Sequence, residues 1–280
     1  MLRALVKEKW RTLVTDLRDS VDAEMMRYRA DTPANQVTKR IAIVCVGAAI
    51  AMLVVRFAGR ETEADWAADL LHKLGFEAQA KKLEWALEKS PDKRIYQRIW
   101  WASGRVLGYG IVPLLVTKLL LRDSIVDMGL RVKGTAKHVP LYLTMFCVVA
   151  PLVFLASYGD GFQAKYPYYR LAKGEGLWPN FILWELLYAS QFIALEYCFR
   201  GFIINGLRQA FGYGAVFVPI IPYAMIHFGK PLPEAIGSII TGFVLGSMAL
   251  KTRSIWGGAA IHISVACSMD FLSLWQQGRL

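Results

Sequence analysis

Cysteine and histidine are both scarce in this sequence, which has only four of each among its 280 residues. The cysteines stand singly in separate apolar segments, with no CxxC spacing, at Cys45, Cys147, Cys198 and Cys267. This distribution excludes a disulfide framework and a zinc knuckle, because both need grouped or paired cysteines. We expect the four side chains to pack as small apolar groups.

We expect no cleavable signal peptide, and the sequence lacks the alternating pattern of a β-barrel and any internal repeat. Its first 40 residues are charged and contain no compact apolar core that ends in small residues. Without barrel alternation, only helices can satisfy the backbone hydrogen bonds inside a bilayer. Without inverted repeats, a proton-coupled transporter is a weaker interpretation of the buried acids and histidines described below.

Apolar residues make up 55% of the chain and lie in blocks separated by charged loops. This arrangement is typical of a polytopic helical membrane protein. We therefore predict an all-α fold: a transmembrane helical bundle of seven to eight spans with a small extramembrane helical insert. The predicted spans are residues 41–57, 99–121, 141–158, 181–212, 215–228, 235–250 and 255–275. The fourth block is long enough to hide an eighth element.

Charged segments divide the rest of the chain. Residues 1–40 carry nine Lys or Arg and six acids, which predicts an amphipathic basic segment on the membrane surface before the first span at 41–57. Residues 58–98 hold eight basic and eight acidic residues at helical spacing, which predicts the extramembrane insert. His72 lies in this insert and is expected to be solvated. Residues 99–280 form the predicted membrane-embedded core.

The formal net charge of +11 is explained by basic residues in loops beside the spans, where they meet anionic lipid rather than nucleic acid. If the amino terminus is inside, its side carries 16 Lys or Arg, and the opposite side carries 12. The first side comprises residues 1–40, 122–138, the Arg208 turn and the 251–253 turn; the second comprises residues 58–98, 159–180 and the Lys230 turn. The positive-inside rule then predicts a cytoplasmic amino terminus in the plasma (inner) membrane.

Three apolar stretches contain polar residues that packing does not explain. Glu196 and Arg200 stand four residues apart in LEYCFRG, Tyr223 and His227 lie in PYAMIHF, and His262 lies in GGAAIHI. A charged side chain at membrane depth costs roughly 2.5–3.5 kcal/mol on insertion scales, so such residues usually serve a function. Small residues around the last histidine permit close approach of helices.

The three stretches are predicted to place these groups at similar depth. Glu196 precedes the turn at 211–214 by about 16 residues and His227 follows it by about 14, which puts both ~20–25 Å from that turn at ~1.5 Å per residue. His262 lies about ten residues, or ~15 Å, past the 251–253 turn. The acid, the arginine and the two histidines are therefore expected to converge in one cavity.

Two kinds of chemistry suit such a cavity. A carboxylate beside imidazoles can take a proton from a bound water, as in general-base hydrolysis. Alternatively, Glu196, His227 and His262 supply the three protein ligands of a catalytic zinc, with water in the fourth position. In either case Arg200, one helical turn from Glu196, would keep that carboxylate ionised.

The motifs at these positions resemble those of the CAAX protease and bacteriocin-processing intramembrane endopeptidases, which are related to the Ras-converting CAAX endopeptidase. The first motif of that family is Glu-Glu-x-x-x-Arg followed by Gly, and corresponds to LEYCFRG at 195–201. The second, an aromatic residue followed by three residues and then His, corresponds to YAMIH at 223–227. The third, His followed four residues later by Asn or another small or polar residue, corresponds to HISVA at 262–266. The resemblance covers about 122–275.

This resemblance implies an intramembrane endopeptidase that hydrolyses a peptide bond in a membrane-associated or exported protein. Its expected partners are that protein or peptide substrate and the lipid bilayer, with no nucleic acid. Glu196 would be the general base, or a metal ligand if the enzyme uses zinc, which is the one cofactor considered. His227 and His262 would position water or stabilise the oxyanion, and Arg200 would set the charge of Glu196.

Two positions depart from the family pattern: Leu195 replaces the first glutamate, and Ala266 replaces the carboxamide. Glu196 itself can be the base, which is the interpretation we favour. Another polar side chain can assist or substitute; the accessory candidates are Glu185, Tyr223, Glu234 and Asp270. The third alternative is a catalytically inactive member that acts as a membrane immunity or scaffold protein.

Overall fold

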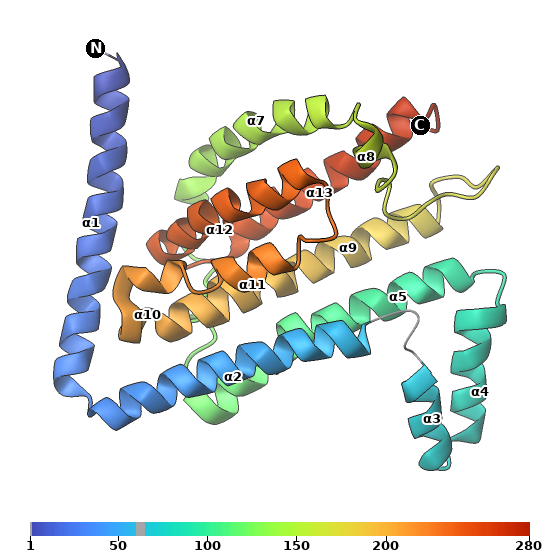
Figure 1. Cartoon of the computed structure of the whole chain (residues 1–280), viewed down its shortest axis with the longest axis horizontal. Helices are drawn as coiled ribbons and strands as arrows, with labels where there is room; N and C mark the ends of the chain where they lie inside the picture. The colour runs from blue at the N-terminus through green and yellow to red at the C-terminus, as the bar shows by residue number, and fades with distance from the viewer. Residues whose placement is uncertain (1, 60–64) are drawn as a thin grey trace. The chain divides into compact units, whose positions relative to one another are not determined.

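The computed structural model describes residues 2–59 and 65–280, with side chains from Val14 onward (Figure 1). This part of the chain is all-helical, apart from one antiparallel bridge between Leu130 and Ser254. The predicted all-α class is therefore confirmed. The predicted insert at 58–98 falls partly on residues 60–64, which lie outside the described residues.

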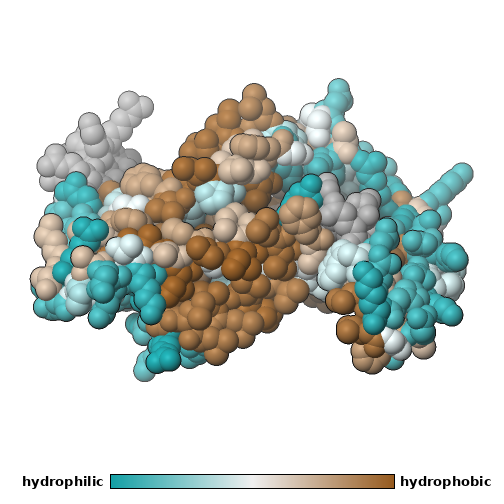
Figure 2. All heavy atoms as spheres, turned by 60° about the horizontal axis from the view of Figure 1, so that its bottom comes forward, coloured by the Kyte–Doolittle hydropathy of each residue, from teal (hydrophilic) through white to brown (hydrophobic). Residues whose placement is uncertain are grey.

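Five helices of the described chain are long and apolar enough to cross a membrane, so the protein is an integral membrane protein. They are Ala34–Ala58 (α2), Lys93–Leu121 (α5 with its continuation), Ala136–Ala156 (which contains α7, Val139–Ala156), Leu232–Thr252 (α12) and Trp256–Gln276 (α13). Each coincides with one of the predicted spans. Figure 2 shows apolar side chains gathered in broad areas of the surface, as expected where lipid is the solvent.

The two remaining predicted spans differ from these five, and a count of seven or eight spans is not shown. Residues 181–212 correspond to α9 (Asn180–Glu196), a π-helical segment (η6, Tyr197–Asn205) and α10 (Gly206–Phe211). This helical run is largely buried and contains buried charges. Residues 215–228 are interrupted: a 3₁₀ turn (η7, Gly212–Val216) precedes the six-residue helix α11 (Ile220–Met225), which is too short to cross.

The chain divides into two compact units. Unit 1 contains Met1–Ala48, Leu114–Thr135 and Tyr197–Trp256, and unit 2 contains Ala49–Pro113, Ala136–Glu196 and Gly257–Leu280.

In unit 1, α1 (Leu2–Asp31) packs against α10 and η7 through acids near its carboxyl end. Asp22 Oδ1 accepts the Tyr213 N–H at 2.8 Å. Gly212 makes this contact possible: its φ is +57°, and a Cβ there would lie 2.1 Å from that carboxylate oxygen. Glu24 accepts hydrogen bonds from Arg253 at 2.7 and 2.8 Å and pairs with Arg208 at 3.4 Å.

The polar loops of unit 1 contact one another. Arg40 bonds the carbonyl of Gly206 at 2.8 Å and pairs with Asp123 at 2.5 Å. Ser254 donates to the carbonyl of Arg131 at 2.7 Å. Together with the Glu24 contacts, these bonds connect four segments of unit 1: the amino-terminal helix, the loop after Leu121, the Arg208 turn and the Arg253 turn. The same segments were assigned to one side of the membrane by the charge count.

Unit 2 begins with the second half of α2, continues through the insert helices α3 (Asp65–Lys73), α4 (Glu77–Glu84) and η2 (Trp85–Lys89), and then enters α5 (Lys93–Arg105). The π-helical segment η3 (Val106–Ile111) follows α5. α5 lies beside α9 (Figure 1). Trp101, Trp184, Tyr188 and Phe192 belong to one buried core cluster. Gly108 allows close approach to α2, since a Cβ there would lie 2.7 Å from the carbonyl of Ala51.

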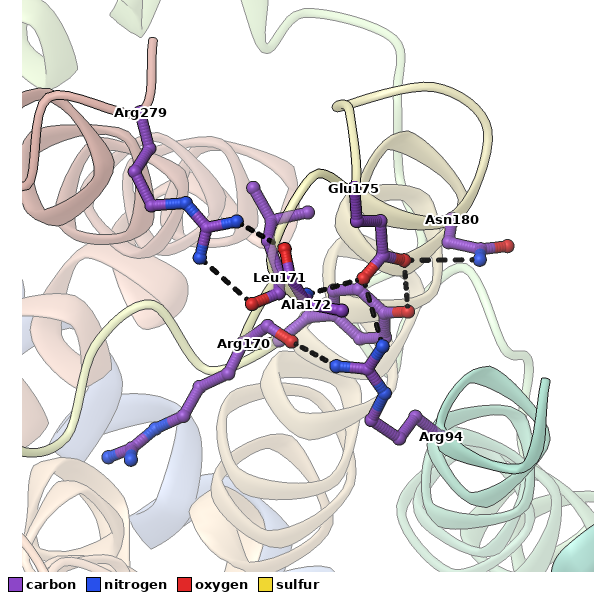
Figure 3. Close-up of polar contacts among 8 residues, drawn as sticks. Arg94, Arg170, Leu171, Ala172, Glu175, Asn180 and Arg279 are labelled. Carbon is purple, nitrogen blue, oxygen red and sulfur yellow. Dashed lines mark hydrogen bonds and ion pairs between the residues drawn. The ribbon is translucent and has the colours of Figure 1, made fainter. Parts of the chain in front are cut away.

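A polar cluster ties the loop before α9 to other parts of unit 2 (Figure 3). Arg94 pairs with Glu175 at 3.0 Å and donates to the carbonyl of Arg170, while Arg279 donates to the carbonyls of Leu171 and Ala172. The cluster therefore joins the start of α5, the loop and the carboxyl-terminal residues of the sequence. The first two of these belong to segments that the charge count placed on the opposite side from unit 1's loops.

Candidate functional site

The acid of the first motif and the histidine of the third motif form a pair inside unit 2. Glu196 is the last residue of α9 and His262 lies in α13, and His262 Nδ1 is 3.1 Å from Glu196 Oε1. An ionised carboxylate only accepts hydrogen bonds, so the proton of a neutral imidazole belongs on Nδ1 and its lone pair on Nε2. Glu196 is 0% exposed, so this pair sits in a water-poor setting.

Small and aromatic neighbours fix the geometry of this pair. Gly258 precedes His262 by one helical turn, and a Cβ at Gly258 would lie 2.7 Å from Glu196 Oε2. Only glycine therefore leaves room for the carboxylate beside α13. The ring of Phe192, one turn before Glu196, lies 4.4 Å from the His262 ring. On the other side, Gly257 faces the ring of Tyr142 in α7, which a Cβ would approach to 2.0 Å.

The other motif residues meet in unit 1. The guanidinium carbon of Arg200 lies 4.0 Å from the centre of the Tyr223 ring, a cation–π distance, and Arg200 is almost fully buried. His227 Nδ1 lies 2.8 Å from the carbonyl oxygen of Tyr223. Because a carbonyl only accepts, Nδ1 carries the hydrogen here too, and the lone pair of a neutral ring is on Nε2. Tyr223 thus holds both Arg200 and His227.

The remaining accessory candidates belong to other arrangements. Glu234 pairs with Lys230 at 3.0 Å at the amino-terminal end of α12, where an acid stabilises the helix dipole. Glu185 lies beside Asp270 and Cys267 within unit 2. Along α9, Glu185 is eleven residues from Glu196, or ~16 Å, and along α13 Asp270 is eight residues from His262, or ~12 Å.

The two departures from the family pattern are apolar and buried in the structure. Leu195 and Ala266 are each 5% exposed. Neither position provides a polar atom beyond the backbone, so Glu196 is the acid that remains in the first motif.

No group of three His, Cys, Asp or Glu side chains in the described residues is arranged to hold a metal ion. Glu196 and His262 by themselves provide two of the three protein ligands that a catalytic zinc uses. The donor set of this pair therefore does not by itself fit a catalytic zinc.

The sequence indicated Glu196 and His262 as candidate site residues but not the contacts that Gly258 and Phe192 make with them. The small residues around His262 indicated close helix approach, and the spacing of four between Gly258 and His262 places both on one face of α13. That spacing indicates that Gly258 leaves room for the carboxylate of Glu196 while His262 forms a hydrogen bond with it. Phe192 carries no signal that separates it from an ordinary core aromatic.

The five apolar helices define an integral membrane protein, and unit 2 contains a contact between the buried carboxylate of Glu196 and the imidazole of His262. Residues 177–267 match the family model described as Type II CAAX prenyl endopeptidase Rce1-like. This range contains Glu196, Arg200, His227 and His262, the residues of the three motifs. Residues 177–267 therefore form an Rce1-like CAAX endopeptidase domain, which confirms the resemblance seen in the sequence. No curated protein and no solved structure matches the chain.

Proposed function

We propose that this protein is an intramembrane endopeptidase that hydrolyses a peptide bond in a membrane-associated or exported protein. The observation that carries the proposal is the 3.1 Å contact between the buried Glu196 and the partly buried His262, within a matched Rce1-like domain. Burying polar groups among apolar helices costs free energy of folding, which favours a functional role for this pair.

In this proposal, Glu196 and His262 act as one base. Glu196 is buried whereas the His262 side chain is 16% exposed, which favours His262 Nε2 as the atom that faces the attacking water. Nε2 takes the water proton as the oxygen attacks the carbonyl carbon, and Glu196 stabilises the resulting imidazolium through Nδ1–H. The imidazolium then returns the proton to the leaving amine. The sequence alone favoured Glu196 as the direct base, and burial shifts the contact with water to its partner.

The roles proposed for Arg200 and His227 follow from the motifs in which they stand. With Nδ1–H bound to the Tyr223 carbonyl, His227 directs its Nε2 away from that bond. A neutral ring would accept a hydrogen from the attacking water, and a protonated ring would donate to the oxyanion. Arg200, held over Tyr223, supplies the positive charge that favours an ionised Glu196.

The test compares wild type with Glu196→Gln, His262→Ala and His227→Ala, each expressed beside a tagged membrane-anchored candidate substrate. We expect a mass shift of the substrate with wild type and a loss of at least 100-fold in cleavage for the Glu196 and His262 variants. Glu234→Gln is the matched control, because Glu234 pairs with Lys230 and is predicted to leave cleavage intact. Cleavage that persists in all three site variants would overturn the assignment.

A second candidate is an inactive family member that serves as an immunity or scaffold protein. Leu195 and Ala266 favour it, because both replace polar residues of the family pattern with buried apolar ones. Restoring the pattern with Leu195→Glu and Ala266→Asn separates the candidates. If the protein is inactive, the wild type would cleave no substrate. The Glu196→Gln variant would bind its partner as the wild type does.

For orientation, we propose a cytoplasmic amino terminus in the plasma membrane. The polar loops that contact one another in unit 1 include the segments with the larger count of basic residues, which supports placing that set inside.

A further inference from the structure

The pair of acids in the middle of unit 2, Glu185 on α9 and Asp270 on α13, is separate from the Glu196–His262 pair. Both are removed from water, with Asp270 0% exposed and Glu185 8% exposed. Two carboxyl groups side by side in an apolar core cannot both stay ionised without strong compensation, because each charge is desolvated and faces a like charge. The two carboxyl groups differ in the hydrogen bonds that they accept.

Asp270 has the environment of an ionised carboxylate. Its Oδ1 accepts the backbone N–H of Tyr168 at 2.9 Å, and its Oδ2 accepts the indole N–H of Trp184 at 3.2 Å. Hydrogen bonds donated to both oxygens favour the charged form. The cation of Arg98 on α5 lies over the rings of Tyr168 and Trp184, at 5.4 and 5.5 Å from their centres.

Glu185 has the opposite environment. Both of its carboxyl oxygens are buried, and neither has a hydrogen bond of normal geometry from a described residue. The titratable groups beside it are Asp270 and Cys267, both on α13, and neither is a cation. A negative charge at Glu185 would therefore be desolvated and next to a second carboxylate, and the thiol of Cys267, a weak donor, is the group beside it that favours the charge.

We propose that Glu185 is a neutral carboxylic acid whose proton is shared with Asp270, so that the two side chains form a buried proton-binding site between α9 and α13. The bound proton converts a like-charge contact into an O–H···O⁻ hydrogen bond, which is among the stronger kinds in proteins. Its ligand is a single proton, held in a site that also includes the Trp184 and Tyr168 donors to Asp270.

This site has a consequence for the acids considered as substitutes for the missing glutamate. A protonated Glu185, bonded to Asp270, is not available to take a proton from water. Because α9 carries both Glu185 and Glu196, and α13 carries both Asp270 and His262, the shared proton instead helps to hold the register in which Glu196 meets His262. This positioning role rests on the proposed function; the protonation state does not.

Infrared spectroscopy of the purified full-length protein tests the proposal without any assay of cleavage. Wild type at neutral pH is expected to show the carbonyl stretch of a protonated carboxylic acid, with the shift in D₂O that an exchangeable proton produces. Glu185→Gln should remove that band, and Asp270→Asn should shift it, because the acceptor of the acid proton changes. Glu175→Gln, a change at an acid in the polar loop cluster, is the matched control and should leave the band in place.

Absence of the band in wild type, or its persistence in Glu185→Gln, would overturn the proposal. A metal cation held between two ionised carboxylates would also give no acid band, and would make the melting temperature rise with sodium or potassium concentration, which likewise contradicts a bound proton. The measurement on wild type needs no variant to fold. Loss of the band with unchanged cleavage in Glu185→Gln would keep the proton site and remove its positioning role.

Discussion

At the scale of single residues, the contact between Glu196 and His262 depends on the absence of a Cβ atom at Gly258. Glu196 fits beside α13 because Gly258 has no side chain, and the same helix then presents His262 one turn later. The pair is therefore specified by three positions rather than two.

Gly258→Ala tests this dependence. The new Cβ would meet Glu196 Oε2 at 2.7 Å, so the carboxylate must move and its bond to His262 must lengthen or break. We expect cleavage to fall at least tenfold, equivalent to about 1.4 kcal/mol of transition-state stabilisation, and overpacking to cost about 1–3 kcal/mol of stability. Rates on the tagged substrate and melting temperatures measure the two effects.

The control is Gly237→Ala in α12, where a Cβ meets nothing within 4 Å. It should retain full cleavage and melt no lower than wild type. Equal cleavage in the two alanine variants would show that Gly258 is not needed for the pair.

Glu196 and His262 could be selected from the sequence as candidates, because charge inside apolar segments is conspicuous and the motif spacing is specific. The partnership of Glu185 with Asp270 could not be predicted. Both were visible as acids near the candidate site, but which acid faces which helix depends on side-chain packing that periodicity alone does not determine.

At the scale of elements, two polar links outside the membrane-spanning helices respond to pH in opposite directions. In the insert, His72 bridges α3 and α4: its Nδ1 lies 2.8 Å from Glu77 and its Nε2 3.1 Å from Glu84. The sequence suggested only a solvated histidine, because the turn that brings Glu84 back to it is a tertiary feature.

The bridge predicts an insert that loosens as pH rises. Hydrogen bonds to Glu84 and then to Glu77 raise the pKa of His72 above its ordinary value. The protonated ring therefore contributes its full stabilisation below the ordinary pKa, and this is lost as pH rises through the raised pKa. Amide exchange of α3 and α4, corrected for intrinsic rates, should become faster over that window. His72→Gln should abolish the trend and Glu88→Gln should preserve it; an unchanged trend in His72→Gln would contradict the bridge.

The loop before α9 shows the reverse dependence. Burial opposes ionisation of Glu175, but hydrogen bonds from the Ala172 N–H, Tyr169 and Asn180, with the charge of Arg94, outweigh it and lower the pKa of Glu175. Burial, reinforced by Glu175, raises the pKa of Tyr169 to about 12, so that its hydroxyl stays a donor. This stabilisation is present above the ordinary pKa of a glutamate and is lost as pH falls through the lowered value.

Glu175→Gln is therefore expected to reduce the free energy of opening of this loop by roughly 1–2 kcal/mol at neutral pH and to flatten its acid sensitivity. Protease cleavage within residues 164–180 measures the opening. Asp160→Asn, at an exposed acid nearby, is the comparison and should behave like wild type. Acid sensitivity that survives in Glu175→Gln would assign the effect to another group.

Helix assignment from the sequence succeeded where apolar residues are continuous and failed where they are interrupted. α2, α7, α12 and α13 are uniform enough for hydropathy to identify them. The segment over 215–228 is equally apolar, but Pro219 and Pro222 limit helix formation, so it forms a turn and one short helix. The run through α9 is helical, but its buried acids and arginine make it an interior element.

At the scale of the whole molecule, the chain is an integral membrane protein whose polar loops fall into two sets. One set is joined by Glu24, Arg40 and Ser254 in unit 1, and the other by Arg94 and Glu175 in unit 2. The charge count separated most of these segments in the same way, since positive residues in loops report on topology independently of packing.

The proposed orientation predicts that a cysteine introduced at Lys133 is labelled by a membrane-impermeant maleimide only after the cells are permeabilised. A cysteine at Lys173 should be labelled in intact cells. Both positions are exposed, so reactivity reports sidedness rather than burial. The four native cysteines are first replaced by alanine, and the unlabelled cysteine-free protein is the control. The reversed labelling pattern would place the amino terminus outside.

The glycine beside the acid has a consequence that reaches past this one chain. Positions 196 and 258 lie 62 residues apart, yet a glutamate fits at position 196 only if the residue at position 258 has no side chain. In a collection of related sequences the two should therefore covary: wherever a larger residue occupies the second position, natural selection should also have replaced the long acid at the first.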